Sequence, residues 1–477
     1  MDEENRTSKR LEPVKNAFEF YGVISIVFGI VYTFCRYNNP SGITYPLFVG
    51  AAYGAAILVL RHSHKALKRG SRFVMGISLL LAVSTCRTGS WVIHWLNSWA
   101  IVFLSAVFVI HQTYEDRKWN IGKYFVSILC YLFTSLCCIG YPFVHMTNFL
   151  KNAKNKNLKN ISMIGLGALF GIPAIFMLAG ILASADIVFD RLFDQFLTSF
   201  LRPWTLIKVV SMAVGGAVGI YGLICGAVVH NMKEQGADRR KYNPVTAISF
   251  MGMIAVLYLM FSLVQIFYLF LAKGSLPEGV TYAKYAHQGF FQLVSVAFLN
   301  LVMVLCCLKY FKKSRILNVI LTIVCLCTYI MILSAAYRMI LYVGEYRLTF
   351  LRVFVLWFLA LLSVLMVGVV IIIYKNEFPL FRYCLAAVSV FYLGFAWARP
   401  DYGIAKYNVA HMTDENRWET MHYLCNKLSS DAAPVIVELS GQGAEEEKQS
   451  YFLRMEEKGK RMSIRSYNFS LAKALKY

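Results

Sequence analysis

The sequence predicts an all-α membrane protein with about twelve transmembrane helices and a small soluble C-terminal helical tail. The chain of 477 residues is 58% hydrophobic and only 16% charged, whereas average soluble domains are about half apolar and about a quarter charged. The apolar residues gather in uncharged blocks, most of which reach the ~20 residues that a helix needs to cross a bilayer. These blocks are apolar all round, whereas a helix of a soluble protein carries a single apolar stripe.

Taken in order, the uncharged blocks give one expected span each. They cover residues 20–35, 37–60, 73–86, 88–114, 124–150, 160–185, 209–232, 242–272, 285–308, 316–337, 353–374 and 383–398. Three of them, 20–35, 73–86 and 383–398, are short for a span. They still cross the membrane if flanking Lys and Arg side chains snorkel toward the interface.

Three parts of the chain follow from this pattern. Residues 1–17 form a polar N-terminal lead, residues 18–398 form the membrane domain, and residues 399–477 form the soluble tail. The tail is a small helical module in which no catalytic pattern is found. It is therefore a candidate surface for a protein partner, and the oligomeric state is left open.

Within the tail, local spacing predicts two helices. Trp418, Met421, Cys425 and Leu428 recur with a helical period. Ser430 stands where a second helix would begin. Residues 441–450 are polar and are expected to be a linker or loop.

The net charge of +22 does not indicate a nucleic-acid partner, because the basic residues lie in short loops between spans. The most basic loops are 61–72, 151–159, 233–241 and 309–315. Such loops face the cytoplasm in polytopic membrane proteins, and they also suit anionic lipid headgroups. The partner that the charge pattern indicates is the lipid bilayer.

The basic loops do not fit a simple count of crossings. One span per block, with the N-terminus inside, places 61–72 inside but 151–159 outside. One block between residues 73 and 150 is therefore expected not to be a simple crossing. The weak block 73–86 and a re-entrant element near Pro142 are the two candidates. With all the basic loops inside, the tail lies on the external side, whereas twelve simple crossings would place it inside.

Glycines and one amphipathic stretch add local expectations. Residues 187–201 place phenylalanines on one helical face and polar residues on the other, which predicts a helix in the plane of the interface. Glycines stand four apart in two spans, and this spacing lets helix backbones approach closely in lipid. The pairs are Gly167 with Gly171, Gly215 with Gly219, and Gly222 with Gly226.

The stretch 337–352 carries charges between two apolar blocks and has two interpretations. In a continuous helix its polar side chains would share one face, because their spacing is 4, 3, 4 and 3 residues. These residues are Arg338, Tyr342, Glu345, Thr349 and Arg352. Such a stripe would bind an anion, pair internally or line an aqueous cavity.

The simpler interpretation of that stretch is a loop over 338–350. The flanking blocks already have full crossing length, and Gly344 is a ready break point. Arg338 and Arg352 would then mark the interface, with tyrosines beside them as an aromatic belt. Span length favours this loop interpretation.

Two further places carry candidate functional polar residues. His287, Gln288 and Gln292 lie at the entry to the span 285–308, where a histidine could relay protons. More often, such groups only hydrogen-bond a loop. Asp186 ends the block 160–185, where helix capping is a simpler role than ion binding.

The sequence contains no GxSxG elbow, P-loop, HExxH or paired carboxylates on one span. Nearly all of the twelve cysteines lie inside spans, without metal-ligand spacing. No catalytic residue, metal or cofactor is therefore expected. Whether the chain is an enzyme stays open, because membrane enzymes often assemble sites from several spans.

Several segments together resemble a bacterial family of polytopic membrane proteins known as domain of unknown function 4173. The segments are 181–193, 282–302, 335–358, 404–412 and 466–474, and the resemblance covers the chain from about residue 160. It implies a bacterial plasma-membrane location and a shared fold, but no reaction. That family usually carries glycine where this chain has Arg347.

Three functions remain as hypotheses. The first is a multi-pass bacterial plasma-membrane protein with a sensory or scaffold role that acts through its tail. The second is a transporter or channel for a small solute, an anion among the candidates, with polar groups of the spans between 285 and 374 lining the path. The third is a membrane enzyme that acts on a lipid-linked substrate.

Overall fold

The computed structural model describes residues 2–116, 119, 121–152, 171, 178, 181–182, 185–186, 203–230, 240–267, 290–375, 377–441 and 443–477. These residues form helices joined by short loops, with one isolated bridge between Tyr242 and Phe311. The expected all-α fold is confirmed for this part of the chain.

The N-terminal half contains α1 (Asp2–Asn16), α2 (Phe18–Arg36), α3 (Tyr45–His62), α4 (Arg69–Arg87), α5 (Trp91–Thr113), α6 (Ile121–Cys137), η1 (Cys138–Gly140), α7 (Tyr141–Asn152) and α10 (Pro203–Val229). The next part contains α11 (Pro244–Gln265), α13 (Phe290–Tyr310), α14 (Arg315–Tyr346), α15 (Phe350–Tyr374) and α16 (Leu380–Trp397). The tail contains α17 (Pro400–Ala410), α18 (Arg417–Lys427), η3 (Ser430–Ala432), α19 (Ala433–Ile436), α20 (Ala444–Lys460) and α21 (Phe469–Ala474).

Ten helices in the described residues are long and apolar enough to cross a membrane. Many apolar helices of this length are the mark of a multi-pass membrane protein. The more polar α4 is not among the ten, yet it packs against α3, α5 and α16. The expected number of about twelve spans is not confirmed.

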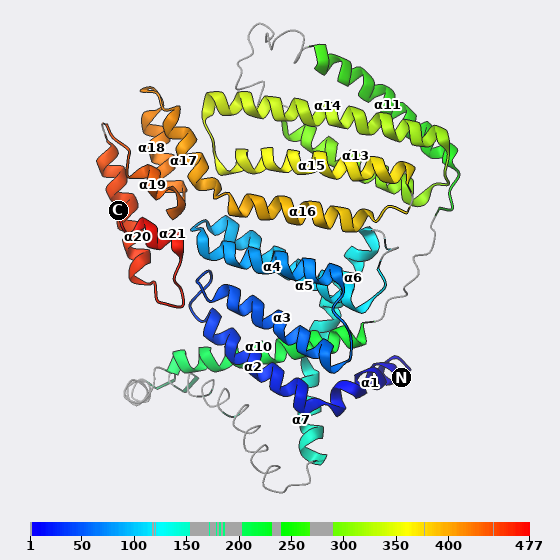
Figure 1. The fold of residues 1–477 in the computed structure, drawn as a ribbon, viewed down its shortest axis with the longest axis vertical. Helices are drawn as coiled ribbons and strands as arrows, with labels where there is room; N and C mark the ends of the chain where they lie inside the picture. Colours follow the sequence, from blue (N-terminus) through cyan, green and yellow to red (C-terminus); the bar gives the residue numbers. More distant parts are fainter. Residues whose placement is uncertain are drawn as a thin grey trace.

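The long helices lie side by side in a row, with α14, α15, α16, α4 and α3 following one another down Figure 1. The tail covers one end of this row, which we call the tail end. The opposite end carries the basic segments 61–72 and 309–315, and we call it the basic end. The tail and these two basic segments therefore lie at opposite ends of the bundle.

The helix α4 makes polar contacts with α5 and α3 that recur every two turns. The hydroxyls of Ser71, Ser78 and Thr85 stand seven residues apart on α4. Ser71 Oγ donates to Gln112 Oε1 at 3.0 Å, and Asn97 Nδ2 donates to Thr85 Oγ1 at 3.0 Å. Ser78 Oγ accepts from a tyrosine of α3 at 2.8 Å. In lipid, such hydrogen bonds between helices help to hold a bundle together.

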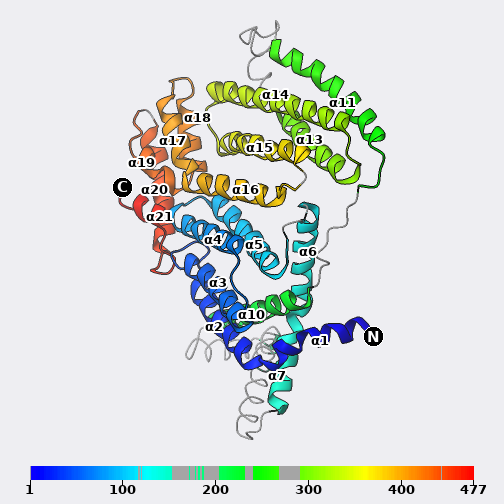
Figure 2. The same ribbon diagram turned by 45° about the vertical axis from the view of Figure 1, so that its right-hand side comes forward.

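The segment α6–η1–α7 begins and ends at the basic end and contains one 3₁₀ turn at Cys138–Gly140. Near its start, Tyr124 stacks on Phe381 at the beginning of α16, with ring centroids 3.5 Å apart. Near its end, the ring of Phe149 packs on the ring of Phe18, the first residue of α2, with centroids 5.6 Å apart. Figure 2 shows α6 at a steep angle to α16. The whole segment Ile121–Lys151 has the length and apolarity of a span, so the expectation that one block before residue 150 is not a simple crossing stays a prediction.

Glycines hold α6 and α10 close together. A Cβ added to Gly226 would overlap Ser135 Oγ, and one added to Gly222 would lie 3.1 Å from the Ser135 carbonyl oxygen. The helix-packing role expected for this glycine pair is confirmed. Gly215 and Gly219 instead have no heavy atom within 4 Å of an added Cβ.

The tail folds into short helices around its own core. Met421 and Cys425 are buried in α18 as their spacing predicts, while Trp418 is 66% exposed. The expected linker over 441–450 is wrong, because α20 begins at Ala444. Three glutamates in its first turn and lysines in its last turn suit the helix dipole. Tyr451 is buried on its inner face.

Candidate functional site at the tail end

The stretch 337–352 is neither the expected loop nor one continuous helix. The helix α14 runs on to Tyr346, and only residues 347–349 separate it from α15. The loop over 338–350 is therefore wrong. Apolar residues continue on the buried side as far as Val343, and they carry the helix past the length needed for a crossing. Gly344 is accommodated inside the helix, with nothing within 4 Å of an added Cβ.

The expected polar stripe is divided between several environments. Arg338 is buried and Tyr342 is half-buried, whereas Glu345 is exposed. Thr349 lies at the start of α15, and its side chain does not cap that helix. These residues therefore do not form one polar face.

Arg352 caps the preceding helix from the next one. Its Nη1 donates to the carbonyl oxygens of Tyr346, at 2.6 Å, and Arg347. Its guanidinium lies 4.4 Å from the centre of the Tyr342 ring. A cation at the carboxyl end of a helix satisfies open carbonyls and suits the helix dipole. The charge thus holds the turn between α14 and α15.

Arg347 adopts a backbone conformation that glycine normally fills. Its φ is 67° and its ψ is 179°, a region essentially reserved for glycine. The turn that a glycine would form is therefore retained here with an arginine. Its side chain donates to the Gly344 carbonyl oxygen at 2.9 Å.

Arg338 belongs to a buried polar group near the tail end of α11 and α14. Its Nη2 donates to Gln265 Oε1 at 3.2 Å, and Ser334 Oγ donates to the same oxygen at 2.6 Å. Of the other predicted residues, Gln292 is exposed on α13 and Asp186 is exposed. His287, Gln288 and the helix expected over 187–201 lie outside the described residues.

The turn 347–349 is a docking point for the tail. Leu348 N donates to Asn408 Oδ1 at 2.8 Å, and Asn408 Nδ2 donates back to the Leu348 carbonyl oxygen at 2.9 Å. Phe350 N donates to the hydroxyl of Tyr423 at 3.1 Å. Asn408 is buried. The polar groups of this turn therefore face the tail.

A second loop, between α4 and α5, holds the tail through a buried carboxylate. The hydroxyl of Thr88 donates to Asp431 Oδ2, and Gly89 N donates to Asp431 Oδ1 at 3.3 Å. Asn468 Nδ2 donates to the Thr88 carbonyl oxygen at 2.9 Å. A Cβ on Gly89 would overlap Ser430 Oγ. The loop and the tail thus approach each other as closely as glycine allows.

A third loop, between α2 and α3, completes the docking surface. Asn39 Nδ2 donates to the Arg465 carbonyl oxygen at 2.8 Å, and Ile43 N donates to the Tyr467 carbonyl oxygen at 3.0 Å. A Cβ on Gly42 would overlap the Arg465 carbonyl oxygen. We call the contacts of the tail with these three loops the tail junction; Figure 1 shows the tail across the ends of the helices that they join.

Two buried carboxylates, Asp401 and Asp431, lie at the tail junction. Ser429 N donates to Asp401 Oδ2 at 3.2 Å. Burial raises the pKa of Asp401, hydrogen bonds from Ser429 lower it, and the charge of Asp431 raises it again, so that the net pKa lies above its ordinary value. In the described part of the chain, no ion pair includes either carboxylate.

A separate buried cluster lies at the basic end. Asp116 accepts from His111 Nδ1, from the hydroxyl of Tyr124 and from Arg382 Nη2, the last at 2.5 Å. Burial raises the pKa of Asp116, but these three donors offset burial and hold the pKa below its ordinary value. Its donors come from α5, α6 and α16, so the cluster ties three helices together.

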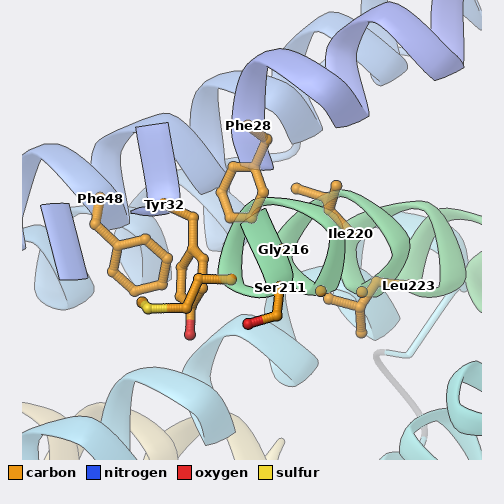
Figure 3. Close-up of a pocket in the computed structure, with 10 residues that line it drawn as sticks. Phe28, Tyr32, Phe48, Ser211, Gly216, Ile220 and Leu223 are labelled. Carbon is orange, nitrogen blue, oxygen red and sulfur yellow. The ribbon is translucent and has the colours of Figure 1, made fainter. Parts of the chain in front are cut away.

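A groove of about 440 Å³ opens on α10 between α2 and α3. Figure 3 shows Phe28, Tyr32 and Phe48 on one side of it and Gly216 and Ile220 on the other. Its lining contains no acid, histidine or cysteine. The described residues contain no group of three or more His, Cys, Asp or Glu that could hold a metal.

Most residues of the tail junction escape sequence reasoning. Thr88, Gly89 and Asp431 stand in short segments without periodicity, and Thr88 and Asp431 are separated by 343 positions. The segment 466–474, which contains Asn468, is one of the segments that carry the resemblance. The sequence shows only asparagines and small residues in loops, and these residue types do not identify their partners.

Comparison with known proteins gives one family. A protein-family model described as "Domain of unknown function (DUF4153)" matches residues 75–439. The number expected from the resemblance, 4173, is not confirmed, although both families lack an assigned function. No curated protein matches the chain, and no solved structure matches it.

Proposed function

The chain belongs to the family of the domain of unknown function DUF4153, and on this premise we propose that it is a bacterial plasma-membrane protein with a sensory or scaffold role. In this role the tail responds to the positions of the membrane helices and presents a surface to a protein partner. The observation that supports the proposal is the tail junction, where loops from three pairs of helices meet the tail through buried and partly buried hydrogen bonds.

The Asp431 contact is the most sensitive part of the junction. The donors to its carboxylate come from the loop that links α4 to α5. A shift of one helix against the other would move Thr88 and Gly89 away from Asp431. Leaving a buried polar group without its donors costs about 1–3 kcal/mol, and more for a charged group. The tail would then detach or rearrange.

The outer surface of the tail offers a place for a partner. Trp418 is 66% exposed and stacks on His422, with ring centroids 5.2 Å apart. His422 in turn contacts Glu447 at 3.0 Å. A large aromatic side chain held rigid on a polar surface is typical of protein interaction sites.

The proposal is tested by photo-crosslinking in cells of the native host. A benzophenone amino acid replaces Trp418 in the full chain, with Leu453 on α20 as the control position. We expect a discrete protein adduct at position 418 that falls several-fold when Asp431→Asn is added. The absence of an adduct, or an adduct yield that Asp431→Asn does not change, would contradict a partner role that depends on docking of the tail.

A transporter for a small solute is the second candidate, supported by the buried arginine of α14. Arg338 lies beside Gln265 and Ser334 in the apolar part of the bundle, and intramembrane charges often mark solute pathways. Anion flux into vesicles that contain the purified protein tests this candidate. We expect flux that Arg338→Gln abolishes if the chain transports anions, and no flux above empty vesicles if it does not.

A further inference from the structure

The loop 461–467, between α20 and α21, carries an unusually exposed apolar side chain. Ile464 is 90% exposed, more than any other large apolar residue of the described chain. The loop is nevertheless held in place, because Ser463 N donates to Ser466 Oγ at 2.8 Å. For an apolar side chain that is this exposed on a fixed loop, being covered by a partner would be favourable.

The position of the loop identifies that partner. Arg465 Nη1 donates to the Phe34 carbonyl oxygen at 3.0 Å, and its guanidinium lies 5.6 Å from the centre of the Phe34 ring. Phe34 is 53% exposed near the end of α2, which is one of the helices with the length and apolarity of a span. The loop therefore lies beside the apolar surface of a membrane helix, at the level where that helix ends.

Cations and aromatic rings surround this end of α2. The guanidinium of Arg36 lies 5.1 Å from the ring centre of Tyr45. Lys208 Nζ lies 5.4 Å from the ring centre of Tyr37. Together with Arg465 they place three positive charges among aromatic side chains, the composition found where spans meet lipid headgroups. Carboxylates on the neighbouring α20 are partly neutralised, as Glu456 pairs with Lys460 at 3.0 Å.

We propose that residues 461–467 form a lipid-contact loop of the tail. Ile464 enters the edge of the bilayer among the acyl chains, and Arg36, Lys208 and Arg465 bind headgroup phosphates. A short apolar tip flanked by cations is the arrangement by which peripheral elements hold a membrane surface. The inference goes beyond the sensory or scaffold role and does not depend on it, because it requires only that α2 spans the membrane.

The test places a benzophenone amino acid at position 464 of the full chain. Leu453 on α20, which is 54% exposed, is the matched position. Both variants are reconstituted in vesicles that contain phosphatidylglycerol and are illuminated, and mass spectrometry of the tail peptides detects lipid adducts. We expect several times more lipid adduct at position 464 than at 453. Equal yields at the two positions, or an adduct only to protein, would overturn the proposal.

A second arm tests the headgroup contacts. Lys208→Gln removes one exposed cation without touching the loop. In vesicles with phosphatidylglycerol we expect it to lower the adduct yield at position 464, and in vesicles of phosphatidylcholine alone we expect a lower yield for both proteins. An adduct yield that changes neither with the lipid headgroup nor with Lys208→Gln would overturn the role of the cations. Limited proteolysis of each variant shows that the tail stays folded.

Discussion

Thr88 and Asp431 stand 343 positions apart in the chain, yet the hydroxyl of Thr88 donates a hydrogen bond to the carboxylate of Asp431. Both residues are buried. The contact joins the loop between α4 and α5 to the tail, and it lies within the part of the chain that matches the family model. We regard it as the centre of the tail junction.

Breaking this contact is expected to loosen the tail. Asp431→Asn weakens the acceptor and Thr88→Val removes the donor, so each is expected to cost about 1–3 kcal/mol of docking free energy. The double variant is expected to cost less than the sum, because both changes remove one interaction. Proteolysis rates of residues 399–477 measure the effect. The exposed Glu438→Gln is the control, and additive costs would show that the two residues do not interact.

The close approach of Gly89 to Ser430 predicts that a second substitution compensates for the first. Gly89→Ala places a Cβ where Ser430 Oγ lies, so the tail is expected to lose docking stability. Adding Ser430→Ala removes the overlapping oxygen and is expected to restore part of the loss. Gly76→Ala, on α4 with open space around it, is expected to change little. Thermal unfolding of the four proteins compares them, and the absence of rescue would contradict the contact.

The tail junction is expected to weaken as the pH rises above the ordinary pKa of Asp401. The pKa of this group is raised from 3.8 in the folded chain, so folding takes up a proton between 3.8 and the raised value. Stability therefore falls as the pH rises through that window. Asp401→Asn is expected to remove this dependence. Hydrogen exchange of residues 429–432 against pH measures it, and an unchanged slope in the variant would refute the assignment.

Asp116 is expected to act in the opposite direction. Its pKa is lowered from 3.8 by its three donors, so its stabilising contribution is complete above 3.8 and is lost as the pH falls through the lowered value. Asp116→Asn is expected to destabilise the basic end of α5 and α16 at neutral pH. Exchange of amides in residues 111–116 reports this loss, whereas equal protection in both proteins would argue against the cluster.

Glycine at position 347 is expected to stabilise the protein. Arg347 occupies a conformation that costs a residue with a Cβ about 1–3 kcal/mol. Arg347→Gly relieves this strain and loses only an exposed hydrogen bond to Gly344. We expect a net gain of about 1 kcal/mol in unfolding free energy. A loss of stability in a thermal unfolding experiment would show that the arginine has a further role at the turn.

The apolar blocks predicted the long helices of the described residues, because a span is a local property of about twenty residues. The charge pattern, in which the basic loops must share one side, adds the expectation that one block before residue 150 is not a simple crossing, and this stays a prediction. The predicted end of the helix α14, before a loop over 338–350, was wrong. The length of a membrane crossing does not limit a helix whose further residues still pack against buried neighbours. The helix ends at Tyr346, where Arg352 binds the open carbonyl oxygens. This contact becomes evident only when the turn 347–349 is seen in the structure.

The tail junction could not be derived from the sequence. Its contacts join Asn468 to Thr88 across 380 positions and Asn408 to Leu348 across 60. Periodicity describes the neighbours of a residue along one helix, so it carries no information about such pairs. The loops of the junction also have an ordinary composition. The role of a glycine or a threonine in them depends on the tail residues that pack against it.

Coupling between the membrane helices and the tail is most directly tested by hydrogen exchange in the Asn97→Leu variant. Asn97 bonds α4 and α16 inside the bundle and does not touch the tail. Its loss is expected to raise exchange in residues 429–432 and 466–474, which contact the loop 88–90. Asn300→Leu, which breaks a similar polar layer between α11 and α14, is expected to leave those residues unchanged. Equal exchange in both variants and the wild type would contradict a tail that responds to the membrane helices.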